Sequence, residues 1–182
     1  MWTASNNDLA FIAAREACVL RAYPDTHSLA IGFGINDKKL KPGDTITYEE
    51  AIRRFLAAAA NYEADINKLF PDNLRPHEYG ALFILDYNIG GTEMGKHRLL
   101  LDAAKNYGDR PKDRTLRGWV SYYMIMSKFS NVTGVFNPAR RYREATLFET
   151  GDYGDISELK FLPANKTNRV DPYEKRPMPK FK

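Results

Sequence analysis

Two carboxylates, Glu16 and Asp25, stand nine positions apart in the stretch REACVLRAYPDTHSLAIGFGIND, which runs from residue 15 to residue 37. Glu16 shares a helical spacing with apolar residues, so the face that carries it should turn toward the core. Burial and the negative end of the helix dipole both favour its protonated form. Asp25, in a polar turn after Pro24, should stay ionised. Two carboxyls in unlike protonation states are the pattern expected for cleavage of a glycosidic bond.

The same two residues also have an ordinary structural interpretation. Glu16 can pair with Arg15 or Arg21, and Asp25 can be a turn residue whose side chain bonds its own backbone. The helix and the turn alone therefore leave the catalytic interpretation open.

The elements that must position these carboxyls are predicted by capping residues and periodicity. Ser5 and Asp8 stand at capping-box spacing and apolar residues then recur at helical spacing, which predicts a helix over about residues 6–21. After a proline turn, SLAIGFGI has the content of a short strand, and DKKLKPGDTI returns as a loop or a second strand. Gly32 and Gly34 permit a bend or a close backbone approach there.

The rest of the chain has mainly helical signals. Thr47 and Glu50 form a second capping box, which predicts a long helix to about Phe70. Further helices are expected at about residues 76–88, 93–107, 113–128 and 138–150, the last with Asn137 as cap, Pro138 in its first turn and Gly151 past its end. The basic segment from about residue 163 onward has little apolar content, and we expect it to be mobile or to lie over the surface.

Composition narrows the class of protein. The chain has 182 residues, of which 43% are hydrophobic and 27% charged, as expected for one compact domain or two small lobes. Its net charge of +4 suits an acidic partner such as nucleic acid, anionic lipid or a cell-wall polymer. The basic residues are mostly scattered, which does not favour nucleic acid.

The single cysteine, Cys18, excludes an intramolecular disulfide and is expected to be a small buried hydrophobe, which favours folding in a reducing cytoplasm. No apolar run is long enough for a transmembrane segment, and the first residues lack the basic region of a secretion signal. A target outside the cytoplasm must therefore be reached by another route.

A longer phrase decides between these interpretations of the carboxyls. EACVLRAYPDT followed by AIGFG resembles the phage-type lysozyme family, the muramidase endolysins of glycoside hydrolase family 24. GDTITYEEA, EYGALFILDYNIGG and GVFNPARRYREATLFETGDY resemble later segments of the same family in the same order, over about residues 8–153. An ordered series is far more specific than any one of its matches.

This resemblance implies a mainly helical α+β, lysozyme-like fold of two lobes. The small β-containing lobe would span about residues 22–46, and the larger helical lobe about residues 47–153 together with the N-terminal helix. The lysozyme domain would then cover residues 1–162, followed by a basic C-terminal tail at 163–182.

The resemblance also implies roles for individual residues. Glu16 would be the general acid and Asp25 the second catalytic carboxylate, while Tyr23, Gly32 and Gly34 would build the turn and strand that hold Asp25 opposite Glu16.

Three further residues would lie near the cleft between the lobes and bind substrate: Asn88, and Arg140 or Arg141. Each has a structural alternative, since Asn88 can cap a helix end and the arginines can brace helices.

The sequence departs from the family pattern in three ways, of which the missing threonine bears on mechanism. Ala30 stands where the family has the threonine that positions the hydrolytic water, and Ile35 replaces a histidine. The turn after Asp25 is also one residue shorter than in the family. Thr26, His27 and Ser28 lie in this turn, where a hydroxyl or an imidazole can orient water or assist Asp25.

The implied reaction is cleavage of the β-1,4 bond between N-acetylmuramic acid and N-acetylglucosamine in peptidoglycan, which lyses the bacterial cell wall. If Asp25 activates a water, the carboxyls should be about 6.5–9.5 Å apart and the anomeric configuration inverts, whereas a nucleophilic Asp25 needs about 5–5.5 Å and retains it. If Glu16 acts alone and the 6-hydroxyl of the sugar attacks, the protein is a lytic transglycosylase that gives anhydro products.

No metal or other cofactor is implied, and the three histidines form no ligand motif. The expected partner is the peptidoglycan glycan strand, bound by a monomer. Delivery would be either release from the host cytoplasm through a separate membrane lesion or carriage on the virion. The alternatives are an inactive fold that only binds wall glycan, suggested by Ala30 and Ile35, and a helical nucleic-acid-binding protein, which rests on charge alone.

Overall fold

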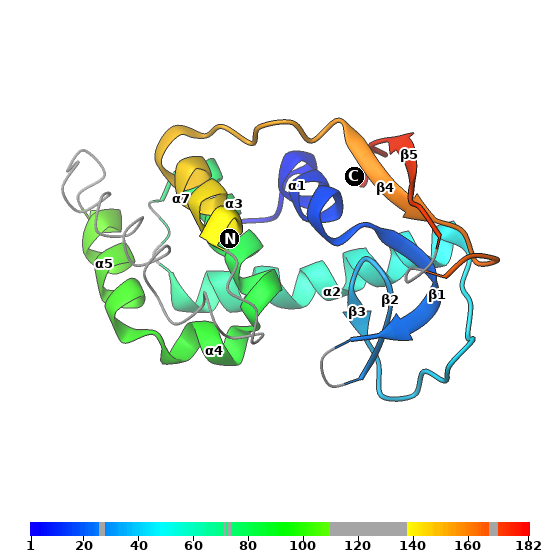
Figure 1. The fold of residues 1–182 in the computed structure, drawn as a ribbon. Coiled ribbons are helices and arrows are strands. Elements are labelled where there is room, and N and C mark those ends of the chain that lie inside the picture. Colours follow the sequence, from blue (N-terminus) through cyan, green and yellow to red (C-terminus); the bar gives the residue numbers. More distant parts are fainter. Residues whose placement is uncertain (26–27, 71, 73, 110–137, 168–170) are drawn as a thin grey trace. The chain divides into compact units, whose positions relative to one another are not determined.

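The computed structural model describes the chain except residues 26–27, 71, 73, 110–137 and 168–170 (Figure 1). The elements in chain order are α1 (Asn6–Glu16), β1 (Cys18–Pro24), β2 (Leu29–Gly32), β3 (Ile35–Asn36), α2 (Tyr48–Leu69), α3 (Pro76–Ile89), α4 (Gly91–Lys96), α5 (Arg98–Asp109), α7 (Pro138–Thr150), β4 (Glu158–Leu162) and β5 (Glu174–Pro177). They fall into two compact units. We call residues 1–8 and 61–154 the helical unit, and residues 9–60 and 155–182 the sheet unit.

Helix α1 begins as predicted but ends five residues early. Ser5 and Asp8 exchange the two capping bonds, since the Ser5 N–H donates to Asp8 Oδ2 at 2.6 Å and the Asp8 N–H donates to Ser5 Oγ at 3.2 Å. The prediction of helix to residue 21 is wrong, because Ala17 takes a left-handed φ of 61° and the chain continues as β1. Strand β1 is stabilised by partners on both sides, with Val19 opposite Gly32 in β2 and Leu162 in β4. Backbone pairing in the sheet thus overrides the local helical pattern.

The sheet has the strand order β3-β2-β1-β4-β5, with β1 and β4 parallel and the other pairs antiparallel (Figure 1). Cys18 begins its central strand and is fully buried, as predicted, and burial raises the pKa of its thiol to about 12. The protein therefore uses this cysteine as a core side chain.

For the described residues of the C-terminal segment, the expectation of mobility is wrong, whereas the alternative that the segment lies over the surface is not contradicted. Strand β5 pairs with β4, Lys175 Nζ lies 2.7 Å from Glu158 Oε2, and the Arg176 guanidinium lies 3.4 Å from the centre of the Phe161 ring. Phe181, only 6% exposed, packs edge-on against two phenylalanines of the sheet-unit core. Few apolar residues suffice here because sheet hydrogen bonds and one aromatic anchor hold the segment. The end of the lysozyme domain at residue 162 stays a prediction.

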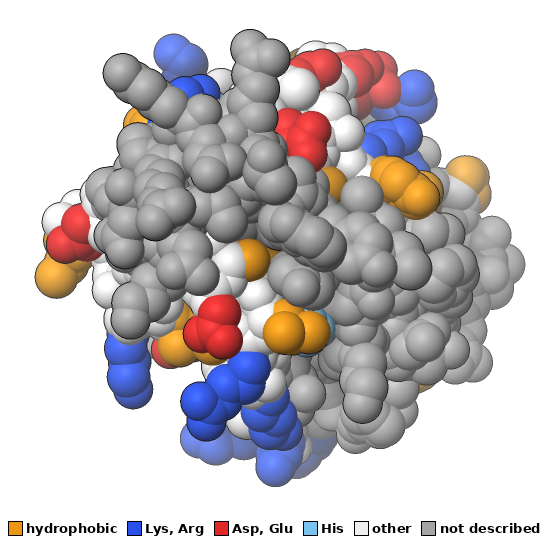
Figure 2. Space-filling view, turned by 90° about the vertical axis from the view of Figure 1, so that its left-hand side faces the viewer, with side chains coloured by type: hydrophobic (Ala, Val, Ile, Leu, Met, Phe, Trp, Pro, Cys, Tyr) orange, Lys and Arg blue, Asp and Glu red, His pale blue; other side chains and the backbone are white. Residues whose placement is uncertain are grey.

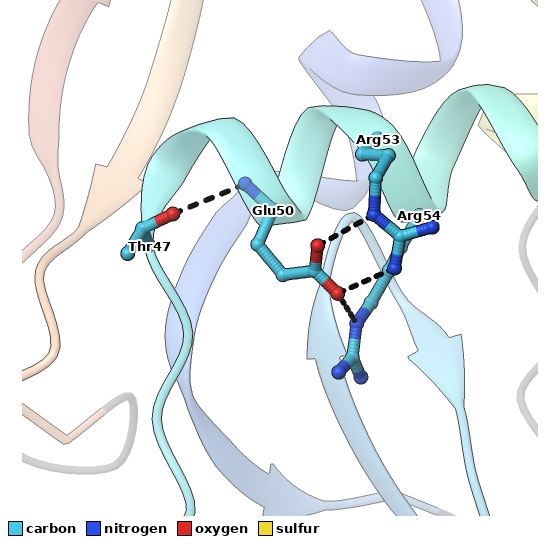
Figure 3. Close-up of polar contacts among 4 residues, drawn as sticks. All are labelled: Thr47, Glu50, Arg53 and Arg54. Carbon is cyan, nitrogen blue, oxygen red and sulfur yellow. Dashed lines mark hydrogen bonds and ion pairs between the residues drawn. The ribbon is translucent and has the colours of Figure 1, made fainter.

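Helix α2 has the predicted bounds, but only half of the expected capping box (Figure 3). Thr47 Oγ1 accepts a hydrogen bond from the Glu50 N–H at 3.1 Å. The Glu50 carboxylate instead binds Arg53 at 2.6 and 2.7 Å and Arg54 at 2.7 Å. These hydrogen bonds lower the pKa of Glu50 to about 2. Because the cluster is exposed, solvent screening leaves it little influence on stability.

The helical unit has its core around α3, which is apolar on nearly every side and packs against α7. Trp2 adds to this core, because its ring centre lies 5.5 Å from those of Tyr79 and Phe83. The predicted helices at 76–88 and 138–150 are confirmed as α3 and α7. The one predicted at 93–107 is divided at His97, whose ψ of 73° is not helical, into α4 and α5. The predicted helix at 113–128 and the cap Asn137 lie outside the described residues.

Candidate active site

Glu16 is the last residue of α1 and is half-buried. Gly34, in the turn between β2 and β3, lies directly against it, because a Cβ on Gly34 would come within 3.0 Å of Glu16 Oε2. Gly34 also has a left-handed φ of 79°, which side-chain-bearing residues rarely adopt. The hairpin backbone can therefore approach this carboxyl closely only because position 34 is a glycine.

Asp25 follows β1 directly and is exposed. Its N–H donates to the Ser28 carbonyl oxygen at 2.9 Å, which closes the turn. Its Oδ2 accepts a hydrogen bond from Asn36 Nδ2 at 3.0 Å, and Asn36 Oδ1 accepts one from Ser28 Oγ at 2.6 Å. Of the three predicted turn residues, Ser28 joins the site through this network, whereas Thr26 and His27 lie outside the described residues.

Sequence reasoning missed Asn36. The signal that can find it is hairpin register, since Asn36 pairs with Ala30, and Ala30 pairs in turn with Tyr23 on β1. Directly opposed residues in antiparallel strands point to the same side of a sheet, so these three side chains share one face.

Tyr23 is half-buried near both carboxyls. Burial raises the pKa of its phenol, and the negative charges of Glu16 and Asp25 raise it further. The side chain therefore stays a neutral hydrogen-bond donor at physiological pH. Gly32 has a left-handed φ of 66°, which favours glycine, and a Cβ there would make only an ordinary contact with Ala51 at 3.4 Å.

The other three predicted site residues belong to the helical unit. Arg141 is only 1% exposed, and its Nη2 donates to Asn88 Oδ1 at 2.5 Å and to Glu144 Oε1 at 3.0 Å. Arg140 Nε donates to the same Glu144 oxygen at 3.1 Å. Burial lowers the pKa of Arg141 to about 10. Arg141 is thus a buried brace between α3 and α7, and a substrate contact by Asn88 and by Arg140 or Arg141 stays a prediction.

The sequence matches the phage lysozyme family over residues 13–144. The chain belongs to the phage lysozyme family. This family makes the protein a glycoside hydrolase of the lysozyme type, and its fold is the expected mainly helical α+β lysozyme fold. No curated protein sequence matches the chain.

Several solved lysozyme structures are similar to this one. The endolysin from Escherichia coli O157:H7 phage FAHEc1 is 26% identical with a TM-score of 0.69, covering 85% of this chain and 98% of its own. A mutant of P22 lysozyme is 22% identical with a TM-score of 0.64, covering 82% and 100%. The muramidase domain of SpmX from Asticaccaulis excentricus is 20% identical with a TM-score of 0.62, covering 82% and 99%. The last two similarities show the fold alone.

Strands β4 and β5 of this lysozyme lie beyond the matched residues, so its sheet is extended by a segment outside the family match. Within the described part of the chain, no three histidine, cysteine or carboxylate side chains are grouped as a metal site. In the same residues, no helix is both long and apolar enough to cross a bilayer.

Proposed function

We propose that this lysozyme hydrolyses the β-1,4 bond between N-acetylmuramic acid and N-acetylglucosamine in peptidoglycan, with Glu16 as general acid and Asp25 as second carboxylate. The observation that supports this assignment is the contrast between the two carboxyls. Glu16 is half-buried at a helix end against the Gly34 backbone, whereas Asp25 is exposed and bound by an amide N–H. Such unlike settings suit one proton donor and one anion.

In the proposed reaction, Glu16 gives its proton to the glycosidic oxygen as the bond to the anomeric carbon breaks. Asp25 stabilises the positive charge that develops on the sugar. A water then adds its hydroxide to the anomeric carbon. Its proton passes to Asp25 if the configuration inverts, or to Glu16 if Asp25 has first formed a covalent glycosyl intermediate. Tyr23 adds a neutral phenol beside both groups.

The test is to digest purified peptidoglycan with wild type, Glu16→Gln and Asp25→Asn and to identify the muropeptides by mass spectrometry. Both variants should lose at least about 100-fold in rate, in line with the contribution of general acid–base groups. Asp37→Asn is the matched control, since this hairpin carboxylate accepts only a local bond from the Lys39 N–H in the contacts described and should keep full activity. Full activity of Glu16→Gln would refute the assignment.

The products distinguish the remaining mechanisms. Reducing N-acetylmuramic acid ends indicate hydrolysis, and the configuration of the first product by NMR separates inversion from retention. Anhydro ends together with an active Asp25→Asn would identify a lytic transglycosylase. Binding of intact sacculi without any cleavage by wild type would identify a glycan-binding fold.

We also propose that the enzyme acts as a monomer and is released to the cell wall through a separate membrane lesion. Its net charge of +4 suits an anionic wall polymer. Figure 2 shows Asp and Glu side chains among the Lys and Arg side chains on the described part of one face, as expected for a mixed rather than a nucleic-acid-binding surface. Carriage on the virion finds no support in the comparisons.

Delivery is tested by expressing the protein in a susceptible bacterium. Cells should remain intact until the inner membrane is permeabilised and should then lyse. Lysis without permeabilisation would contradict the proposed route, and light scattering of the purified protein tests the monomer.

A further inference from the structure

We propose that Asn36 is a positioning residue for the reaction, which orients Asp25 through its amide and is itself held in place by Ser28. This inference rests on the proposed function. Its basis is the continuous chain of bonds from Ser28 Oγ to Asn36 Oδ1 at 2.6 Å and from Asn36 Nδ2 to Asp25 Oδ2 at 3.0 Å.

The polarity of these bonds allows one arrangement of the amide. An ionised carboxylate only accepts hydrogen bonds, so the NH₂ group of Asn36 must face Asp25. Its carbonyl oxygen then faces Ser28, where the hydroxyl donates to it. Rotating the amide by half a turn would place two acceptors against each other at Asp25. The carboxylate therefore sets the orientation of the amide, and the Ser28 hydroxyl, which can donate or accept, donates to the amide oxygen and holds the Asn36 side chain in place.

Asp25 needs a hydrogen-bond partner because its own position does not hold its side chain. It is exposed and lies just past the end of β1, so burial does not fix its rotamer. The bond from its N–H to the Ser28 carbonyl oxygen fixes the backbone only. Holding Oδ2 fixes the plane of the carboxylate, and so it also fixes the direction in which Oδ1 points. A reacting water or sugar carbon must meet that oxygen within narrow geometric limits.

Strand β3 of the hairpin carries Asn36, which donates the hydrogen bond to Asp25. Asn36 pairs directly with Ala30, and Ala30 with Tyr23, so the three side chains share a face across three strands. The methyl group of Ala30 cannot form a hydrogen bond. Among the contacts described for this row, the Asn36 side chain is the one that donates to Asp25, and its place in a paired strand makes it a rigid support.

The test compares kcat, KM and thermal stability for wild type, Asn36→Leu, Ser28→Ala and the double variant. Leucine keeps the size of asparagine and removes both hydrogen bonds. We expect Asn36→Leu to lower kcat by about 10- to 100-fold while KM changes less than about 2-fold, because orientation of the carboxylate matters at the transition state. Its melting temperature should stay near that of wild type, since Asn36 is exposed. Asn61→Leu, at an exposed position in α2, is the matched control and should be fully active.

The order of action is tested by the double variant. Ser28→Ala alone should lower kcat less than Asn36→Leu does, and adding Ser28→Ala to Asn36→Leu should change nothing further, because Ser28 acts through Asn36. Asn36→Asp should lower kcat at least as much as Asn36→Leu, since it places a like charge beside Asp25.

The outcomes separate the two proposals. An Asn36→Leu variant with wild-type kcat, or Ser28 and Asn36 effects that add fully, would overturn the positioning role while a strong effect of Asp25→Asn leaves the proposed function standing. A kcat loss that follows loss of folded protein would also overturn it. A wild type that cleaves no peptidoglycan, or an unimpaired Asp25→Asn, would overturn both.

Discussion

The sheet unit and the helical unit treat polar side chains in opposite ways. In the sheet unit, Asp25, Asn36 and Ser28 form their hydrogen bonds at an exposed or half-exposed position. Among the described residues, every fully buried charged side chain belongs to the helical unit: Asp8, Glu78, Asp86, Arg141 and Glu144. Exposed groups cost little desolvation and can be offered to a ligand, whereas the buried ones other than Asp86 are hydrogen-bonded to internal partners. A cluster of polar side chains is therefore a candidate binding site only where these side chains are exposed.

The largest effect expected from this contrast is on Arg141→Ala. This change leaves Glu144 as a buried charge without its strongest partner and should lower the free energy of unfolding by about 3–5 kcal/mol. Urea denaturation of the variant measures it. Arg53→Ala, which removes the exposed partner of Glu50, should produce no measurable change. If both variants lowered the free energy of unfolding equally, the contrast between buried and exposed ion pairs would be refuted.

In the sheet unit, where the described residues include no fully buried charged side chain, apolar contacts should be the main source of stability. The Phe181 ring centre lies 5.8 Å from that of Phe33 and 5.2 Å from that of Phe55, so Phe181→Ala should destabilise the protein by about 3 kcal/mol. Phe33 precedes Gly34, and we therefore expect activity to fall as well, because the turn against Glu16 loses its support. Thermal unfolding and hydrolysis assays measure both effects, with exposed Tyr142→Ala as the control. Unchanged stability would show that Phe181 does not anchor the C-terminal segment.

The buried carboxyl of Asp86 should make the stability of the helical unit depend on pH. Burial, with a smaller contribution from the charge of Asp65, raises the pKa of Asp86 from 3.8 to about 7, and no described residue hydrogen-bonds either oxygen. The folded state thus binds a proton that the unfolded state releases. This contribution to stability is fully present below about pH 4 and is lost as the pH rises to about 7.

Asp86→Asn should remove that pH dependence and raise the free energy of unfolding at pH 8 by on the order of 2 kcal/mol, less than the full pKa shift implies because the amide is also buried. Denaturation of both proteins at pH 5 and pH 8 measures it. The stabilisation should disappear at low pH, and a gain that is the same at both pH values would refute the assignment to Asp86.

The smallest expected effect concerns the residue after Glu16. Ala17 has a φ of 61°, which costs an L-residue about 1 kcal/mol or more. Ala17→Gly should therefore stabilise the protein slightly, by about 0.5 kcal/mol after the entropy of glycine is counted. Ala13→Gly, within α1, should instead destabilise it by about 1 kcal/mol. If both glycines destabilise, the left-handed end of α1 is not strained.

Elements with local signals were predictable from the sequence. Helices α2, α3 and α7 have caps, prolines or glycines at their ends and form where these signals place them. The end of α1 was not predictable, because Val19 becomes strand only when it pairs with Leu162, which is distant in the chain. The C-terminal strand likewise depends on its partner, and composition alone made it look unstructured.

The candidate site divides in the same way. Glu16, Asp25 and Gly34 could be named from their spacing and their motif, and the structure brings Gly34 against Glu16. Asn36 was missed because its bond to Asp25 exists only once the hairpin closes. The resemblance placed Arg140 or Arg141 near the substrate, and the local sequence does not show that Arg141 lies in the core.

The sequence by itself determined the family, through an ordered series of motifs, and most helix boundaries, through capping signals within a few turns of the chain. The tertiary structure decided which charges are buried, which strand lies beside β1 and which side chain grips Asp25. The physical reason is that burial and strand pairing are properties of contacts between distant segments, whose free energy no local pattern records.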